Sequence, residues 1–164
     1  MSKFMYDVYS VFIDFAINQY GRVKAYMKSL GVDKPIHIGE TGWASHSDGF
    51  YGPEGSRACD ELKQALYHKH MRDWTNKAGL SCFYFQAIDE PWKDAGNPNG
   101  SENHFGLFTV DGKAKHVIWD LVDQGIFNGL KRGGNSIVKT FDGDESKMME
   151  TVFNPAMAKE LIED

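Results

Sequence analysis

Cysteine is scarce in this chain of 164 residues, which contains only Cys59 and Cys82. Neither belongs to a CxxC pair, so the sequence excludes a disulfide-stapled scaffold and gives no support to a zinc or redox motif. We expect two buried free thiols rather than a bridge. Positive charge is not in excess either, because the formal net charge is -5. The composition therefore gives no reason to expect a nucleic acid as a partner.

Long apolar runs and targeting signals are also absent. The apolar runs fall far short of a membrane span, and Met1-Ser2-Lys3 is not followed by a signal-peptide core. The sequence has no Gly-rich phosphate loop, no Gly-x-Ser-x-Gly elbow and no histidine pair at metal-binding spacing. We therefore expect no metal and no organic cofactor. A hydrophobic content of 41% with 13% aromatic residues favours one packed domain over disorder.

Apolar periodicity predicts an alternation of helices and strands. Gly31 and Gly79 supply helix stop signals, and Ser56 is the expected N-cap of a helix. The expected helices cover residues 12–30, 56–79 and 115–127, and the expected strands cover residues 36–39 and 80–88. The second strand is dense in aromatic and apolar residues, which is typical of a strand buried on both faces.

Strand–helix–strand order with short links predicts parallel strands. Two strands cannot by themselves form a parallel sheet that is buried on both faces, so the pattern indicates part of a larger α/β architecture. After Gly129 the sequence changes character, with a turn at 132–135, a short strand at 137–141 and a mildly amphipathic end. We expect residues 1–128 to form the main unit and residues 129–164 a peripheral extension.

Polar and aromatic residues follow both predicted strands. The first strand ends in Gly-Glu-Thr-Gly-Trp, which brings in Glu40 and Trp43, and the second ends in Asp-Glu-Pro-Trp-Lys, with Glu90, Trp92 and Lys93. Catalytic groups in parallel α/β folds gather at the carboxyl ends of strands. Glycines beside Glu40 also allow a bulge or the close approach of a ligand.

A carboxylate at such a strand end can attack an anomeric carbon if it stays ionised, and a nearby Lys93 favours the ionised form. Indole faces offer platforms for sugar rings. Other roles stay open from spacing alone: Glu40 as a capping or salt-bridged carboxylate, Glu90 as a surface partner of Lys93, Asp89 as a turn cap, and the tryptophans as packing residues.

Three motifs together carry a family resemblance. The first motif (residues 38–45, IGETGWAS), the second motif (residues 85–93, FQAIDEPWK) and the third motif (residues 104–108, HFGLF, shortly after Glu102) resemble, in order, the conserved blocks of glycoside hydrolase family 17, the β-1,3-glucanase-like family. The resemblance covers roughly residues 11–122. Ala44 stands where a proline is usual and Ile88 where an aromatic residue is usual, and neither change removes a functional group.

The resemblance implies an α/β fold, the C-terminal part of a (β/α)8 TIM barrel with its seventh and eighth strands and flanking helices. It implies a retaining glycosidase, a hydrolase of O-glycosyl bonds in laminarin-type β-1,3-glucan. Glu40 matches the nucleophile, Glu90, Lys93 and Glu102 match supporting polar groups, and Trp43, Trp92 and Phe105 would contact the sugar. The expected partner is a polysaccharide or oligosaccharide.

In this family the acid/base glutamate follows the fourth strand, upstream of the nucleophile. No Asn-Glu pair precedes Glu40 here, so the resemblance implies that the acid/base and the N-terminal barrel portion lie upstream. We expect the isolated 164 residues to be an incomplete barrel with little activity. Two alternatives stay open, a β-1,3-glucan transglycosylase and a non-catalytic glucan-binding remnant. The family implies an extracellular, periplasmic or cell-surface location.

Overall fold

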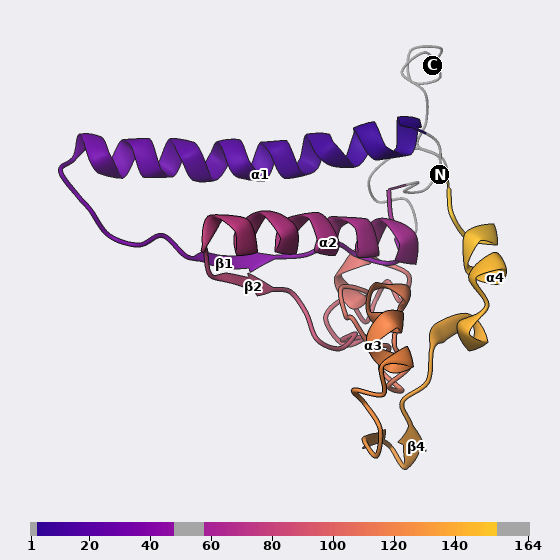
Figure 1. Cartoon of the computed structure of the whole chain (residues 1–164). Coiled ribbons are helices and arrows are strands. Elements are labelled where there is room, and N and C mark those ends of the chain that lie inside the picture. Colours follow the sequence, from indigo (N-terminus) through magenta and orange to yellow (C-terminus); the bar gives the residue numbers. More distant parts are fainter. Residues whose placement is uncertain (1–2, 48–57, 154–164) are drawn as a thin grey trace.

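The computed structural model describes residues 3–47 and 58–153, and the side chains of residues 13–47 and 58–153 (Figure 1). Four helices, four short strands and three 3-10 turns follow one another in these ranges. In chain order they are α1 (Lys3–Ser29), β1 (Ile38–Thr41), α2 (Glu61–Ala78), β2 (Cys82–Tyr84), η1 (Ser101–Asn103), η2 (His116–Ile118), α3 (Trp119–Asp123), β3 (Lys131–Arg132), β4 (Asn135–Ser136), η3 (Thr140–Gly143) and α4 (Glu145–Glu150).

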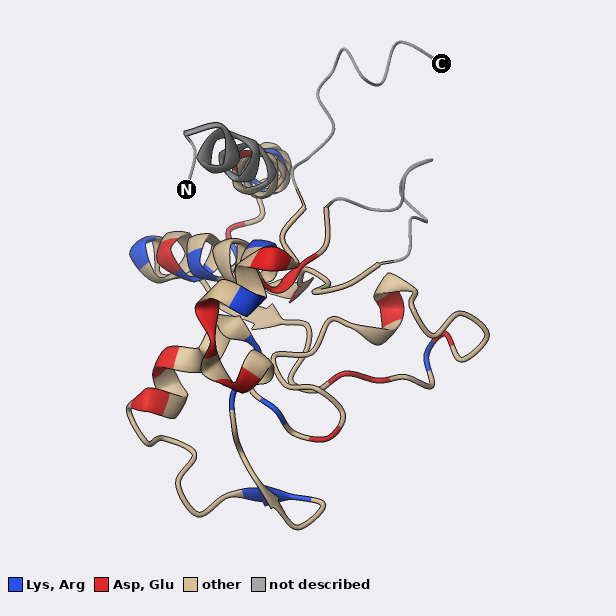
Figure 2. Cartoon of the chain, turned by 90° about the vertical axis from the view of Figure 1, so that its right-hand side faces the viewer, with Lys and Arg blue, Asp and Glu red and all other residues tan. Residues whose placement is uncertain are grey.

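The centre of the fold is a β1–α2–β2 unit. β1 and β2 pair in parallel, which confirms the strand–helix–strand prediction. Figure 1 shows α2 lying between this small sheet and the long helix α1. The core between the helices contains Ile13, Tyr67 and Met71, and the ring of Tyr20 meets that of Trp74 edge to face at 5.8 Å. Figure 2 shows acidic and basic residues interspersed along α2.

The helix ends agree with the sequence at their C-termini more closely than at their N-termini. α1 ends at Ser29 before Gly31, whose φ is +70°, and Gly79 closes α2 in the left-handed conformation. The predicted N-cap Ser56 lies outside the described residues, and the N-cap of α2 is Asp60. The predicted third helix is shorter than expected, because α3 has five residues after a 3-10 turn.

The sheet differs from the prediction in extent and burial. β2 has three residues instead of the nine predicted over 80–88, and Ile88 forms an isolated bridge with Phe108. The side chain of Phe83 is 65% exposed, so β2 is not buried on both faces. The reason is that α2 packs against one face of the sheet, and among the described residues no second layer covers the other. The predicted strand at 137–141 is reduced to a bridge at Lys139 that leads into η3.

The chain after residue 128 packs onto the body of the fold. β3 and β4 form a hairpin around the predicted turn at 132–135. Met148 of α4 is fully buried against Leu62 of α2 and Trp119 of α3. A domain boundary at residue 128 stays a prediction, but the described part of this extension shares a core with α2 and α3. No helix in the described ranges combines the length and apolar character needed to cross a membrane.

Candidate active site

Glu40 lies on a bulge at the carboxyl end of β1. Ile38 pairs with Cys82 and Thr41 pairs with Tyr84, so the register shifts by one residue between them. Ile38 packs against the α2 core, and the Thr41 hydroxyl lies 2.6 Å from the Tyr67 hydroxyl of α2. Ile38 and Thr41 both face α2. The extra residue between them therefore turns Glu40 away from α2. Glu40 is exposed, and its carboxylate makes no hydrogen bond or ion pair with any described residue.

Glycines bring the three motifs into direct contact. A Cβ atom at Gly42 would lie 2.0 Å from the Phe85 carbonyl oxygen, and one at Gly106 would lie 2.2 Å from the Asp89 nitrogen. Both approaches are closer than any side chain permits. Main-chain hydrogen bonds from Phe85 N to the Thr41 oxygen (2.6 Å) and from Gln86 N to the Phe105 oxygen (3.2 Å) complete the contact. The motifs that the sequence separates therefore form one surface at the end of β1 and β2.

Glu90 and Lys93 pair with each other. Lys93 Nζ lies 3.0 Å from Glu90 Oε2 and 3.9 Å above the centre of the Phe85 ring. Among the described residues, no ion pair joins Lys93 to Glu40. The alternative in which Glu90 serves as the partner of Lys93 is thus the arrangement found, and Lys93 does not contact the predicted nucleophile.

Trp43 and Phe105 line a mainly apolar cavity of about 430 Å³. The Trp43 indole donates a hydrogen bond to the Ala58 oxygen at 2.8 Å and packs against Tyr67, so it has both a packing role and a lining role. The Phe105 ring packs edge to face on Phe85 at 5.5 Å. The described residues that line it are Gly42, Trp43, Ala44, Ala58, Cys59, Ser101 and Phe105.

The remaining predicted site residues lie outside this cavity. Trp92 is 62% exposed in the turn at the end of the second motif, and it makes no ring contact with a described residue. Glu102 is exposed in η1, although its neighbour Ser101 lines the cavity. The structure therefore brings Trp43 and Phe105 together and does not bring Trp92 to them.

The sequence reasoning missed a buried ammonium group beneath the motifs. Lys115 is 2% exposed, and its Nζ donates to Asp89 Oδ1 (2.7 Å), Ser45 Oγ (2.7 Å) and the His104 oxygen (3.3 Å). Burial lowers the pKa of Lys115, and the Asp89 carboxylate raises it in opposition. Asp89 is no simple turn cap, since it also accepts from Gly106 N at 2.9 Å. One cation thus links all three motifs.

Glu61 is a buried carboxyl group that the sequence analysis also did not single out. Burial raises its pKa, while the hydrogen bonds from Thr140 Oγ1 and His116 N, both 2.7 Å, lower it. These bonds tie α2 to η2 and to η3. Glu61 therefore holds elements together and does not face the cavity of Trp43.

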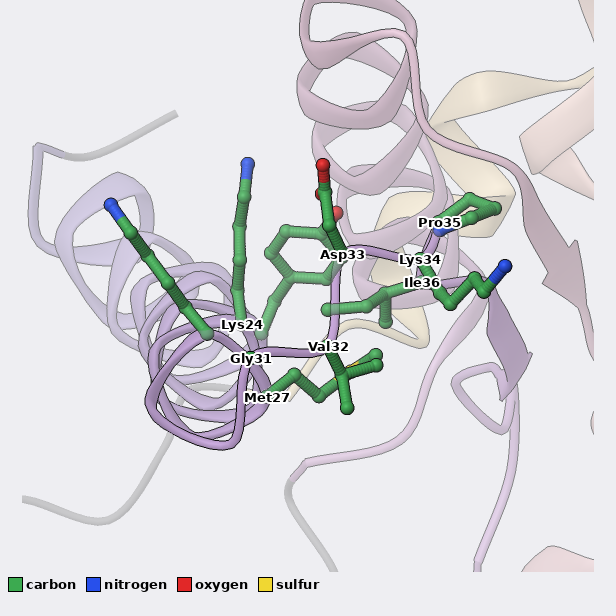
Figure 3. A pocket seen from close by; sticks show the side chains of 10 residues that line it. Lys24, Met27, Gly31, Val32, Asp33, Lys34, Pro35 and Ile36 are labelled. Atoms are coloured by element: carbon green, nitrogen blue, oxygen red, sulfur yellow. The ribbon is translucent and has the colours of Figure 1, made fainter.

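A larger cavity, of about 680 Å³, lies at the other end of β1, between the end of α1 and residues 31–36 (Figure 3). Its lining includes Lys24, Lys28, Asp33 and Lys34 and none of the predicted site residues. It lies at the amino end of the strand, whereas parallel α/β folds place their chemistry at the carboxyl ends. The candidate active site is therefore the Glu40 end.

Among the described residues no cluster of three His, Cys, Asp or Glu side chains is arranged to hold a metal ion. Cys59 and Cys82 are not joined by a disulfide, and the first is buried and the second half-buried.

The comparisons with known proteins point to one class of enzyme. No family model matches the chain. It is 36% identical over 88 residues to a glucan 1,3-β-glucosidase of Arthroderma benhamiae, over 49% of this chain and 26% of the relative. An endo-laminarinase from Formosa Hel1_33_131 is 61% identical with a TM-score of 0.83, over 87% of this chain and 36% of the other. A glycoside hydrolase family 17 β-1,3-glucanosyltransferase from Rhizomucor miehei is 28% identical with a TM-score of 0.50, over 63% of this chain and 34% of the other.

The relatives named here are enzymes that act on glucans. More narrowly, these matches confirm the resemblance to glycoside hydrolase family 17 over part of the length of the relatives. By this resemblance the protein is similar to glycosidases. The chain spans about a quarter of the Arthroderma relative and about a third of the two solved structures, as the shares of 26%, 36% and 34% show.

Proposed function

We propose that this chain is the C-terminal portion of a retaining glycoside hydrolase that cleaves O-glycosidic bonds in laminarin-type β-1,3-glucan, with Glu40 as the nucleophile. The observation that carries the proposal is the bulge at the end of β1, which turns Glu40 away from α2 and leaves its carboxylate exposed. The close similarity to an endo-laminarinase supports the substrate class.

In the proposed reaction the Glu40 carboxylate attacks the anomeric carbon of a glucosyl unit. The bond to the leaving oxygen breaks while an acid group protonates that oxygen, and a glycosyl ester of Glu40 forms. Water, deprotonated by the same group, then attacks the anomeric carbon and releases the sugar with its configuration retained. Carboxylate chemistry of this kind requires no metal or organic cofactor.

The partner carboxyl group of a retaining glycosidase lies about 5–5.5 Å from the nucleophile. Glu90 is paired with Lys93, and Asp89 with Lys115, so both carboxylates are engaged in ion pairs. We infer that the acid/base comes from a part of the protein outside these residues. In this proposal β1 and β2 are the seventh and eighth strands of a (β/α)8 barrel.

Exposed apolar side chains support a larger protein around this chain. Phe15 and Tyr26 on α1 are 63% and 66% exposed, and Phe83 on β2 is 65% exposed. Large apolar side chains exposed on a helix and on a strand are consistent with surfaces that pack against further protein. Further strands of the barrel would cover Phe83 and pair with the open edges of the sheet.

The other predicted site residues take supporting roles in the proposal. The cavity of Trp43 and Phe105 binds a glucosyl ring against aromatic faces, and Trp92 and Glu102 contact sugar at the rim. Lys93, which is paired with Glu90, lies over the ring of Phe85, and Phe85 packs against Phe105. We further propose an extracellular, periplasmic or cell-surface location, where β-glucans are met as substrates.

The test is Glu40→Gln in the full-length protein, with release of reducing ends from laminarin as the readout. Removal of a nucleophile is expected to lower kcat/KM by about 10³-fold or more. The matched control is Glu150→Gln, an exposed glutamate of α4, which should leave the rate unchanged. Azide added to Glu40→Ala should restore turnover and give a glucosyl azide of inverted configuration. Undiminished cleavage by Glu40→Gln would rule out the nucleophile assignment.

A second candidate function is glucan transfer. It is favoured by the structural similarity to the β-1,3-glucanosyltransferase of Rhizomucor miehei. The same glycosyl ester would then be attacked by a sugar hydroxyl instead of water. Products longer than the laminari-oligosaccharide supplied would indicate transfer, and shorter products alone would indicate hydrolysis. Binding of glucan without any cleavage would instead identify a non-catalytic glucan-binding module.

A further inference from the structure

Gln64 is a fully buried amide on α2, outside all three motifs. Its side chain has no exposed surface, and its Nε2 donates to the main-chain oxygens of Trp43 (3.0 Å), Gly106 (3.0 Å) and Phe105 (3.3 Å). All three partners are carbonyl groups, which only accept hydrogen bonds, so the NH2 end of the amide must face them. One side chain thus contacts the main chain at both aromatic residues that line the 430 Å³ cavity.

Packing alone does not explain a glutamine at this position. Its Oε1 is buried and has no hydrogen-bond partner among the described residues, which is unfavourable for a polar atom. A methionine of similar length would fill the space without burying this acceptor. Lys115 and the hydrogen bond from Ser45 N to the His104 oxygen (3.0 Å) already join these two segments, which lie more than sixty residues apart in sequence. What the amide adds is a direct link between their main chains at Trp43 and Phe105 themselves.

We propose, resting on the glucan-cleaving function above, that Gln64 is a positioning residue that sets the separation of Trp43 and Phe105 and so the fit of a glucosyl ring between them. The two rings have separate supports, since Trp43 is held by Ala58 and Tyr67, and Phe105 by Phe85. Gln64 joins these two supports through the main chain. Its loss lets one wall of the cavity move relative to the other.

The kinetic consequence separates positioning from mere stability. Ring contacts in the cavity form with the bound glucan and persist through the reaction, so weakening them raises KM and changes kcat little. A side chain that only stabilises the fold acts differently. Its loss lowers the amount of active enzyme, and therefore the maximal rate, while the remaining molecules keep their KM.

The experiment compares Gln64→Met with Thr75→Val in the full-length protein, using laminari-oligosaccharides as substrates. Thr75 lies on the same helix, is 1% exposed, and donates within α2 to the Met71 oxygen at 2.8 Å, so it is a matched buried control. We expect KM to rise on the order of tenfold for Gln64→Met, the scale of one weakened aromatic contact, and to stay unchanged for Thr75→Val. If Gln64→Met does not fold, Gln64→Asn retracts the donor by one methylene and should also raise KM.

A second readout needs no glucan activity. Cys59 lines the cavity and is buried, so in a Cys82→Ser background its reaction with a thiol reagent reports on the opening of the cavity walls. Gln64→Met should label faster than the parent at temperatures where both are folded, and Thr75→Val should not.

The outcomes distinguish the two proposals. Faster labelling with a raised KM supports the positioning role. Unchanged labelling, or a lower maximal rate with an unchanged KM, overturns it. Faster labelling in a protein that neither binds nor cleaves β-1,3-glucan supports the link between the cavity walls and overturns the proposed function.

Discussion

Two glycines on either side of Glu40 meet opposite surroundings, although the sequence presents them as equivalent. An added Cβ at Gly39 would meet no atom within 4 Å, whereas one at Gly42 would lie 2.0 Å from the Phe85 oxygen. Gly39 lies in the bulge, where the strand faces open space. Gly42 lies where the first motif crosses the second, so the close approach of two main chains requires it.

We expect Gly42→Ala to lower the free energy of unfolding by about 1–3 kcal/mol or more, because the methyl group must displace main-chain atoms of the second motif. Gly39→Ala is the control. It should leave stability unchanged or raise it by about 0.4–1 kcal/mol, because it restricts the unfolded chain. Urea denaturation of the two variants measures both values. Equal losses at the two positions would contradict the close approach at Gly42.

At the level of elements, the start of α2 combines a helix cap with a buried ion pair. Asp60 is 3% exposed, and its Oδ1 accepts from Lys63 N at 2.8 Å. Its Oδ2 pairs with Lys63 Nζ, which is 1% exposed and also donates to the Phe153 oxygen at 2.6 Å. The cap of α4 is different, because Asp144 caps Ser146 and Lys147 near the surface.

Asp60→Ala is therefore expected to cost about 3–5 kcal/mol, since it leaves the Lys63 ammonium buried without its carboxylate. Asp144→Ala removes only an exposed cap and should cost about 1 kcal/mol. Asp60→Asn keeps an acceptor for the cap and loses the charge, so its cost should fall between the two. Chemical denaturation of the three variants gives the comparison, and similar costs for Asp60→Ala and Asp144→Ala would show that the buried pair adds nothing.

At the scale of the whole molecule, the chain after residue 128 contributes to the same core as α2. Met148 is fully buried with Leu62 and Trp119. The Thr140 hydroxyl donates to Glu61 at 2.7 Å and accepts from the Trp119 indole at 3.2 Å. An apolar cluster and a polar one therefore both join the extension to the body of the fold.

Met148→Ala should destabilise the protein by about 2–5 kcal/mol, the usual cost of truncating a buried methionine. Met149 next to it is 43% exposed, and Met149→Ala should change stability by no more than about 0.5 kcal/mol. Thermal denaturation should show one transition that shifts as a whole in Met148→Ala. A separate early transition for the extension, with the main transition unmoved, would mean that it folds apart from the body.

Local sequence was sufficient for the features that depend on neighbouring residues. Apolar periodicity predicted α1, α2 and the parallel strands. The glycines beside Glu40 allowed either a bulge or the close approach of a ligand, and β1 has a register shift between Ile38 and Thr41. The three motifs predicted which strand ends meet. Their order and spacing pointed to glycoside hydrolase family 17. The comparisons confirm this resemblance over part of the length of the relatives.

What only the tertiary structure decided is the set of partners that meet across long sequence distances. Lys115 and Gln64 carry no local signal, because a buried polar side chain is recognised only by the distant carbonyls and carboxylates it satisfies. The sequence also left two roles open for Glu90, and the structure pairs it with Lys93. The C-terminal ends of α1 and α2 and the strand motifs follow from short-range steric and hydrogen-bonding rules, whereas the fit of the aromatic cavity depends on how separate segments pack together.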